Sequence, residues 1–378
     1  MTQVGNEPIP KTQRAAVSDD PSGFKIKEIP VVQPDQLEPG RALVKVLYSG
    51  VCHTDLHVIK NEWPVHPERP CIAGHEGSGI IVAINDATSQ FKVGDRVGIK
   101  WIATSCNECD FCLAGNEPLC LQAKCSGINA QGSFMQYCPA YTSQLTRIPD
   151  GLDMAEAAPI LCAGVTVWKA LKNSKARAGQ YVCIPGAGGG LGSLALQYAR
   201  YMGISTIAID SGAEKKALCE KYGASAFIDF KEVTDIVSAV KAATPDGLGP
   251  QAAIITSPKP EAYLIAMEYI RPGGTVVAVG LPPAGAYVKA DVFFTVLHNK
   301  NLVSSYVGNR LDANEALDIV AKGHVTCPIV VEPFDSLDSF YTRMAQGTLA
   351  GRGVIDLWNK RLGFRKKRNG KIRSEGGP

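Results

Sequence analysis

The second half of the chain alternates between two kinds of segment, and this alternation restricts the fold more than any other feature of the sequence. Six short segments rich in β-branched residues are predicted strands: 181–187, 205–210, 226–230, 252–257, 275–280 and 302–307. The helices expected between them cover 191–203, 213–223, 234–244 and 260–274. Strands that alternate with helices of roughly ten to fifteen residues are typical of βαβ units around a parallel sheet. Six strands in this order predict a doubly wound α/β domain that binds a dinucleotide.

The first part of the chain, up to about Gly151, has a different pattern. Short β-branched segments are broken by Gly and Pro, and the segments 42–50, 77–85 and 95–101 are predicted strands of a barrel-like β unit. After Val307 the character is mixed again, and we expect this part to pack back on the first domain.

Length and composition set broad limits on the class of protein. A chain of 378 residues is too long for one core and fits two domains. The 45% of hydrophobic and 20% of charged residues are ordinary for a globular protein, and no apolar run approaches the roughly 20 residues that span a bilayer. The first twenty residues lack the apolar region of a signal peptide and contain acidic residues, so we expect a cytoplasmic protein. In that compartment the twelve cysteines favour metal binding or catalysis over disulfides.

The net charge of +3 is unevenly distributed. Residues 360–378 hold eight Lys or Arg and one Glu, which leaves the remainder of the chain mildly acidic. Because this tail has almost no apolar residues, a solvated, disordered segment is favoured over a nucleic-acid-binding one.

Four cysteines form the strongest local motif. Cys106, Cys109, Cys112 and Cys120 have the spacing C-x2-C-x2-C-x7-C, which lets four thiolates surround one tetrahedral Zn²⁺ with no open position. A redox CxxC pair is a weaker interpretation because four ligands are present. An iron–sulfur cluster is an alternative, although the spacing differs from the ferredoxin patterns. We therefore expect a structural metal site that takes no part in catalysis.

A glycine-rich turn follows the strand at 181–187 and opens the next helix. Glycines at this place let the backbone approach a pyrophosphate, although the strict G-x-G-x-x-G pattern is not intact here. Asp210 ends the following strand, where a carboxylate can bond the ribose hydroxyls. The same charge repels a 2′-phosphate and favours NAD over NADP, while Lys215 and Lys216 lie close enough to weaken that preference.

Three further residues are far apart in the sequence and suggest a second metal site. Cys52, the histidine of GHEG (His75) and Cys162 together supply two thiolates and one imidazole. This set binds a catalytic zinc with one position left open for a substrate. Each residue alone is more often an ordinary buried side chain.

The motifs taken together resemble one family. GVCHTDLH, AGHEGSG, the four-cysteine lobe, APILCAGVTVWKAL, GGLGSLA, SYVGNR and GRGVIDL occur in the order found in yeast-type zinc-dependent alcohol dehydrogenases. These enzymes belong to the medium-chain dehydrogenase/reductase superfamily, and the resemblance runs from about Arg14 to Leu357. It implies a GroES-like β-rich catalytic domain over 1–162 with the structural zinc lobe at 104–122. It also implies a Rossmann NAD-binding domain over 163–304, a return segment over 305–358 and an additional basic tail over 359–378.

The resemblance also implies a role for each matching residue. Cys52, His75 and Cys162 match the catalytic zinc ligands, with Glu76 as an acid that can join them, and Cys106, Cys109, Cys112 and Cys120 match the structural zinc ligands. Thr54 matches the hydroxyl that bonds the alcohol, His57 the far end of a proton relay through the nicotinamide ribose, and Asp55 a support for His75. The expected cofactor contacts are His53, Gly189, Gly190, Leu191, Asp210, Lys215, Phe230, Val279, Ser305, Val307 and Arg352.

The expected substrate is a short primary alcohol. Trp63 and Trp101 match bulky pocket walls, and Leu281 stands where the family usually has Met. The implied activity is reversible hydride transfer between an ethanol-like alcohol and NAD, with two Zn²⁺ per subunit and a homotetrameric assembly. The alternatives are the same fold acting on an aromatic alcohol, a polyol or another aldehyde and, more remotely, a zinc-ribbon nucleic-acid binder.

Overall fold

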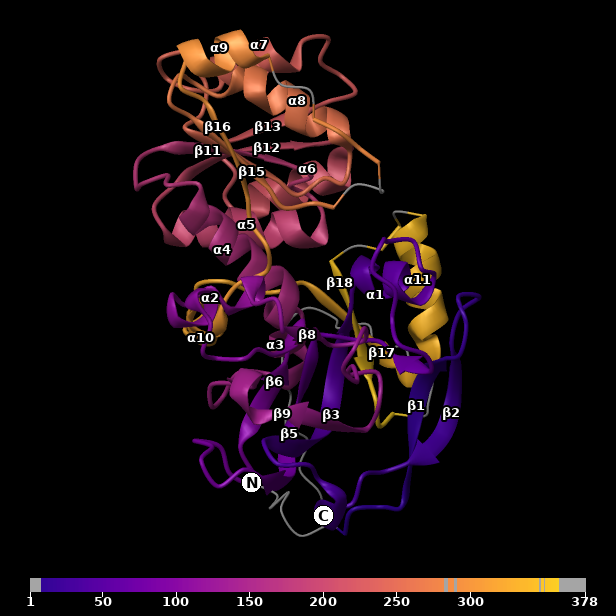
Figure 1. The fold of residues 1–378 in the computed structure, drawn as a ribbon. Coiled ribbons are helices and arrows are strands. Elements are labelled where there is room, and N and C mark those ends of the chain that lie inside the picture. The colour runs from indigo at the N-terminus through magenta and orange to yellow at the C-terminus, as the bar shows by residue number, and fades with distance from the viewer. Residues whose placement is uncertain (1–7, 282–284, 289–290, 347, 350, 360–378) are drawn as a thin grey trace, which may run out of the picture.

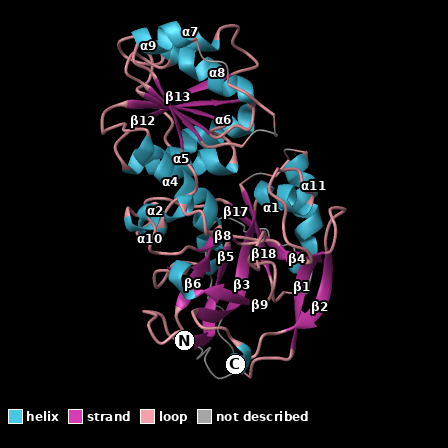
Figure 2. Ribbon diagram, viewed as in Figure 1, coloured by secondary structure: helices cyan, strands magenta, loops and turns pink. Residues whose placement is uncertain are grey.

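The computed structural model describes residues 8–281, 285–288, 291–346, 348–349 and 351–359. The expected basic tail therefore lies almost wholly outside the described residues. Figure 1 shows a parallel sheet with its helices at one end of the molecule and a β-rich unit at the other. Helices α4 and α10 lie where the two meet, and Figure 2 separates the two parts by their content of helix and strand.

The parallel sheet has six strands in the order β13-β12-β11-β14-β15-β16. Their bounds are Tyr181–Pro185 for β11, Ser205–Asp210 for β12, Ala226–Asp229 for β13, Ala252–Ile255 for β14, Thr275–Ala278 for β15 and Asn301–Ser304 for β16. The helices that follow are α5 (Gly190–Tyr201), α6 (Ala213–Lys221), α7 (Ile236–Ala242), α8 (Pro260–Tyr269) and α9 (Val292–Leu297). Numbered along the chain, the strand order is 3-2-1-4-5-6, so the predicted doubly wound dinucleotide fold is confirmed.

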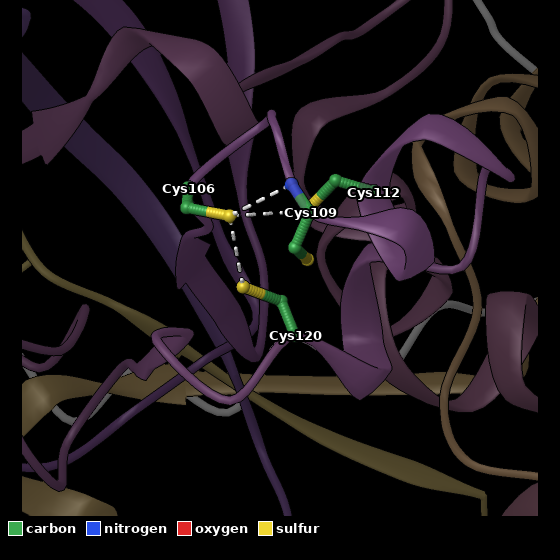
Figure 3. Close-up of side chains that lie close together, drawn as sticks. All are labelled: Cys106, Cys109, Cys112 and Cys120. Atoms are coloured by element: carbon green, nitrogen blue, oxygen red, sulfur yellow. Dashed lines mark hydrogen bonds between the residues drawn. The ribbon is translucent and has the colours of Figure 1, made fainter.

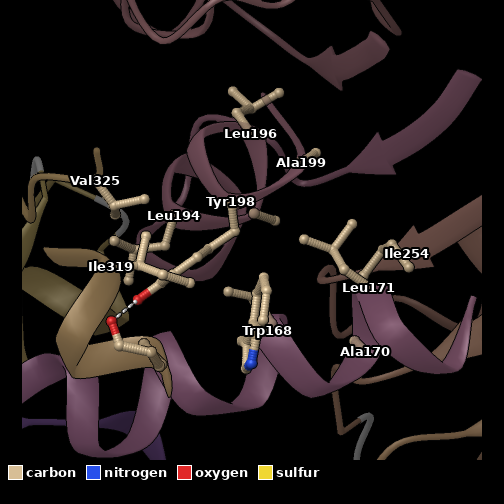
Figure 4. Close-up of a cluster of buried hydrophobic side chains, with 14 of the residues drawn as sticks. Trp168, Ala170, Leu171, Leu194, Leu196, Tyr198, Ala199, Ile254, Ile319 and Val325 are labelled. Carbon is tan, nitrogen blue, oxygen red and sulfur yellow. Dashed lines mark hydrogen bonds between the residues drawn. The ribbon is translucent and has the colours of Figure 1, made fainter. Parts of the chain in front are cut away.

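Both faces of this sheet are buried, as expected for parallel strands. On one face Val182 and Ile184 pack with Leu171 of α4 (Val165–Asn173) and with Leu194 of α5. Figure 4 shows this cluster, in which the Tyr198 hydroxyl donates a 3.0 Å hydrogen bond to the carbonyl oxygen of Ala316. The opposite face packs against α7 and α8.

The β-rich unit is built around a sheet with the order β10-β6-β5-β3-β18-β17, and β9 also pairs with β3. The bounds are Arg41–Val51 for β3, Gly77–Asn85 for β5, Arg96–Ile99 for β6, Tyr137–Tyr141 for β9, Thr146–Arg147 for β10, Ile329–Pro333 for β17 and Arg352–Asp356 for β18. Smaller sheets contain β1 (Thr12–Ser18), β2 (Lys25–Pro30) and β4 (Cys71–Ile72), and β7 (Ile102–Thr104) with β8 (Lys124–Cys125). The three strands expected from sequence correspond to β3, β5 and β6.

The segment after β16 divides between the two units. Helix α10 (Arg310–Ala321) packs on α4, and its residues Ala316 and Leu317 belong to the core of the parallel sheet. Strand β18 pairs antiparallel with β3, and α11 (Leu337–Ala345) packs on the same unit. The domain bounds expected from sequence stay a prediction. Helix α10 lies within the expected return segment, yet it contacts the core of the dinucleotide-binding unit.

A continuous helical run connects the two units from Met154 to Asn173. It consists of α3 (Met154–Pro159), the π-helical turn Ile160–Gly164 and α4. By length and composition this run could cross a membrane, so the expectation that no segment approaches that length is wrong, but 78% of its most apolar window is buried inside the fold. We therefore interpret it as a core helix. The π turn holds Cys162, and such turns are frequent at functional sites.

Candidate zinc and dinucleotide site

The four cysteines of the lobe converge. Their sulfur atoms all lie within 4.8 Å of one another (Figure 3). The Sγ of Cys106 is 3.9 Å from that of Cys112 and 3.6 Å from that of Cys120. Four sulfurs at about 2.3 Å from one tetrahedral zinc would be about 3.8 Å apart, so these separations fit a closed zinc site. Backbone N–H groups of Glu108 and Cys109 lower the pKa of Cys106 to about 7, which favours the thiolate that a metal needs.

The lobe is anchored at the junction of the two units. The buried carboxylate of Glu117 accepts hydrogen bonds from the backbone N–H of Arg310 at 2.8 Å and from its guanidinium Nε at 3.2 Å. The side-chain amide of Asn309 donates to the carbonyl oxygen of Gly115 at 2.7 Å. Because both partners lie at the start of α10, the lobe is held against the helix that also packs on the dinucleotide-binding unit.

A second ligand set forms between the two units. Cys52, His75, Glu76 and Cys162 each offer one atom, and these atoms lie within 4.8 Å of one another. They come from the end of β3, the connection between β4 and β5, and the π turn. The Nε2 of His75 is 3.3 Å from the Sγ of Cys162. The structure thus brings together the residues that the sequence proposes for a catalytic zinc.

Asp55 organises this set from behind. One carboxylate oxygen lies 2.8 Å from Nδ1 of His75 and accepts the backbone N–H of Gly74 at 3.0 Å. The other accepts the backbone N–H of Cys52 at 3.2 Å. With Asp55 only 2% exposed, these bonds favour hydrogen on Nδ1 and leave the Nε2 lone pair of His75 available to a metal.

Glu76 is fully buried and pairs with the guanidinium of Arg352. Its Oε2 has no hydrogen-bond partner among the described residues, and burial raises the pKa of the carboxyl to about 8. A buried carboxylate oxygen without a partner, beside two thiols and an imidazole, fits a cation at this place. Arg352 also adjoins the glycine turn, because a Cβ placed on Gly190 would lie 2.6 Å from its Cδ.

The glycine turn fits a dinucleotide. Gly189 caps α5, and a Cβ at Gly192 would lie 2.2 Å from the carbonyl oxygen of Gly186, so the turn can close only without side chains. The carboxylate of Asp210 accepts the backbone N–H of Gly188 at 2.9 Å and pairs with Lys215 at 2.8 Å. The acid expected to bond the ribose therefore lies at the turn expected to hold the pyrophosphate.

The remaining predicted cofactor contacts are distributed along the same edge. Ser305 is buried and accepts a 3.2 Å hydrogen bond from Asn173, while Val279 and Leu191 pack on the core. Phe230 is partly exposed at the end of β13. Val307 has φ +42°, a left-handed conformation that is costly for a β-branched residue and is typical of constrained functional loops.

An apolar wall adjoins the zinc ligands. The Trp101 ring lies edge-on to the imidazole of His75 with centroids 5.1 Å apart, and Trp63 belongs to the same cluster. Trp63 in turn stacks on His57 at 5.1 Å. Leu281, the third expected wall residue, is 59% exposed and belongs to none of the buried clusters.

The structure adds Tyr306 to this wall, a residue that the sequence reasoning passed over between Ser305 and Val307. Its hydroxyl accepts a hydrogen bond from the indole N–H of Trp101, so a residue that follows β16 reaches the β-rich unit. Burial raises the pKa of Tyr306, and the thiol of Cys125 is a second hydrogen-bond partner. Its position in the SYVGNR motif was the only signal that could have indicated it.

Helix α1 (His53–Ile59) carries the other predicted residues. Thr54 is half-buried and His53 is exposed. His57 lies on the last turn, and its Nδ1 is 2.6 Å from a carboxylate oxygen of Glu62, which the sequence reasoning did not single out. The helix thus presents a hydroxyl and two imidazoles next to Cys52.

This combination of a doubly wound dinucleotide domain, a β-rich domain and two zinc-type ligand sets defines a zinc-dependent dehydrogenase. Residues 38–150 match the alcohol dehydrogenase GroES-like domain, and residues 190–322 match the zinc-binding dehydrogenase domain. The chain belongs to this alcohol dehydrogenase family of zinc-binding dehydrogenases.

Named relatives agree over most of the chain. Alcohol dehydrogenase 1 of Emericella nidulans is 47% identical over 92% of this chain and 99% of its own length. Alcohol dehydrogenase 1 of Neurospora crassa is 46% identical over 92% of this chain and 98% of its own length. The crystal structure of the alcohol dehydrogenase of the archaeon Aeropyrum pernix superposes with a TM-score of 0.81 at 25% identity, over 91% of this chain and 99% of that one.

Proposed function

We propose that this chain oxidises a short primary alcohol to the aldehyde with NAD, and catalyses the reverse reaction. The observation that carries the proposal is the set of Cys52, His75 and Cys162 beside the apolar cluster of Trp63 and Trp101 and a glycine turn suited to a dinucleotide. Zinc held by these residues would supply a Lewis acid for the alcohol oxygen, and NAD would accept the hydride.

The residues of the chain divide the remaining tasks. Thr54 provides a hydroxyl near the zinc ligands that can orient the alcohol and pass on its proton, and His57 provides an imidazole at the exposed end of α1. Trp63, Trp101 and Tyr306 limit the size of the substrate and exclude water. Arg352 lies between Glu76 and the glycine turn, where its positive charge can also bind the pyrophosphate.

Initial rates with alcohols of two to six carbons, each with NAD and with NADP, test the proposal. We expect the highest kcat/KM for the shortest primary alcohols and a clear preference for NAD, because of the aromatic wall and the Asp210 carboxylate. Higher kcat/KM for benzyl alcohol or a polyol would show that the same fold serves another substrate. His57→Gln should lower kcat while the zinc content stays unchanged, and a lost equivalent of zinc would contradict the proton-transfer role.

The remote alternative, a zinc-ribbon nucleic-acid binder, predicts salt-dependent retardation of DNA in a gel. It leaves Asp210, the glycine turn and the second ligand set without a role. NADH formation from ethanol by protein that does not retard DNA would exclude it.

We propose that the cytoplasmic form of the protein is a homo-oligomer, a tetramer by its resemblance to the family. One face supports self-association: β16 is the last strand of the parallel sheet and, among the described strands, pairs only with β15. Helix α9, which precedes β16 in the chain, exposes five apolar side chains, namely Val292, Phe293, Phe294, Val296 and Leu297. Such a strand edge and apolar surface favour sheet extension by a second copy. Phe293→Glu should reduce the mass measured by light scattering, whereas the exposed Phe111→Glu on the zinc lobe should leave this particular contact intact.

A further inference from the structure

The imidazole of His57 is held by Glu62. Its Nδ1 lies 2.6 Å from Oε2 of that glutamate, a short distance for a charge-assisted hydrogen bond. One face of the ring stacks on Trp63 with an interplanar angle of 23°. Among the described residues Nε2 of His57 has no hydrogen-bond partner. One ring nitrogen is therefore engaged by an acid, and the other remains available.

The turn after α1 fixes Glu62 in this position. The backbone N–H of Glu62 donates to the carbonyl oxygen of His57 at 3.0 Å, and Asn61 takes a left-handed conformation with φ +53° that reverses the chain. Arg69 locks the turn by donating to the carbonyl oxygen of Ile59 at 2.7 Å and to the side chain of Asn61 at 2.9 Å. The backbone thus sets the acid opposite the imidazole.

The pair contributes little to stability. The side chains of His57 and Glu62 are 31% and 45% exposed, and ion pairs exposed to this degree stabilise a fold by about 0–1 kcal/mol. A carboxylate that accepts from one ring nitrogen of a histidine nevertheless selects its tautomer, whatever its effect on folding. A second titratable group near this ring is His53, whose ring centroid is 6.2 Å away on the same helix.

We propose that Glu62 is a positioning residue for the proton transfer of the proposed alcohol oxidation, and this inference rests on that function. Its carboxylate holds hydrogen on Nδ1 of His57, which leaves the lone pair of Nε2 free to accept the proton that the alcohol releases. The imidazolium formed then gives one N–H proton to water at its exposed edge, and Glu62 restores the Nδ1–H tautomer. No covalent bond other than N–H forms or breaks at these two residues.

Two measurements on the zinc-loaded, full-length protein test this proposal. Ring nitrogen-15 shifts from solid-state NMR of sedimented, histidine-labelled protein report the tautomer directly, with His57→Gln identifying the signal among six histidines. We expect Nδ1–H in the wild type and a shift toward Nε2–H in Glu62→Ala. The same variant should lose about tenfold in ethanol kcat, a modest part of the 10²–10⁴ typical of acid–base catalysis, at unchanged KM for NAD. Added formate, but not chloride, should restore part of the rate.

Glu68→Ala is the matched control, because Glu68 is an exposed acid of the same loop region and, within the described part of the chain, its side chain makes no hydrogen bond or ion pair with His57. It should change neither the tautomer nor the rate. A Glu62→Ala protein with an unaltered tautomer would overturn the proposal, whether or not its rate falls. An unaltered kcat would overturn it as well. The NMR measurement also separates this proposal from the proposed function. If the wild type oxidised no alcohol, the proposed function would fail, and the spectra would still show whether Glu62 sets the tautomer of His57.

Discussion

Lys100 offers a direct test of how the β-rich unit is packed beside the active site. Its ammonium is buried at 4% exposure, immediately before Trp101 in the sequence. It donates to the side-chain oxygen of Gln144 at 3.0 Å and to the carbonyl oxygen of the same residue. Burial lowers the pKa of Lys100 to about 7 from the ordinary 10.5, and the charge of Glu117, which is bonded to Arg310, offsets this only in part.

This shift makes stability depend on pH. Below pH 7 the folded protein must bury a charged ammonium and carries the full cost, and above pH 10.5 the lysine is neutral in both states and the cost disappears. Between these values the unfolded chain binds more protons, so stability rises with pH by up to about 1.4 kcal/mol per unit. From pH 7.5 to 9.5 this gives about 2 kcal/mol from one side chain.

The change to make is Lys100→Met, which keeps the length of the side chain and removes the charge. At a single pH its effect is ambiguous, because it also leaves the Gln144 oxygens without a donor, at a cost of about 1–3 kcal/mol. The diagnostic quantity is the difference in unfolding free energy between wild type and variant, which should grow by about 2 kcal/mol in favour of the wild type from pH 7.5 to 9.5.

Urea titrations followed by tryptophan fluorescence, at fixed protein and zinc concentrations, measure this difference. Lys92→Met, which replaces an exposed lysine of the same unit, should show a difference that is flat with pH. A flat difference for Lys100→Met would refute the reasoning, because it would mean that the ammonium stays charged and hydrated in the folded protein.

Three other substitutions test separate parts of the structure. Cys120→Ser removes one ligand of the four-cysteine lobe, so elemental analysis should find one zinc per chain rather than two, and loss of both metals would contradict separate sites. Arg352→Met removes the counter-charge of Glu76, whose pKa is already about 8, so the carboxyl takes up a proton and the unfolding free energy in urea should fall by less than the about 3–5 kcal/mol of a broken buried pair, with Arg352→Lys partly recovering it. Val307→Gly relieves a left-handed backbone by about 1–2 kcal/mol but loses the side chain's packing on the Trp101 cluster and adds backbone entropy to the unfolded chain, so its unfolding free energy should exceed that of Val307→Ala, which keeps the strain; equal values would mean that the loop is not strained.

The sequence predicted the dinucleotide-binding sheet well because its signal is local. The six strands are short segments that all occur where expected, and the central ones are buried on both faces, whereas β16 at the edge is largely exposed. The four cysteines of the lobe were also grouped by a local signal, their spacing, whereas Cys52, His75 and Cys162 are far apart in the sequence and depended on resemblance for their roles. Residues such as Tyr306 and Glu62 have no periodic or spacing signal, because what singles them out is a contact with Trp101 or His57 that exists only after folding.

The position of Cys52 relative to His75 depends on the register of two strands, which the sequence does not specify. Strands β3 and β5 are antiparallel, and their register pairs Ser49 with Gly77. Continued by a few residues beyond the ends of the strands, the same register places Cys52 opposite the segment that contains His75. Two irregularities within β3 shift this register, between Leu43 and Val44 and between Val46 and Tyr48. Because a one-residue slip moves each side chain to the other face, spacing along the sequence could not fix which residues meet.

Gly50 is the position at which this register leaves no room for a side chain. A Cβ on this residue would lie 1.8 Å from Oε2 of Glu76, so the buried carboxylate occupies the space that a side chain would need. The backbone N–H of Gly50 also donates to the carbonyl oxygen of Glu76 at 3.0 Å. From the sequence alone this glycine reads as the end of a strand. In the folded chain it permits an acid to approach two thiols and an imidazole, and the chemistry of the site therefore depends on a residue that contributes no functional group.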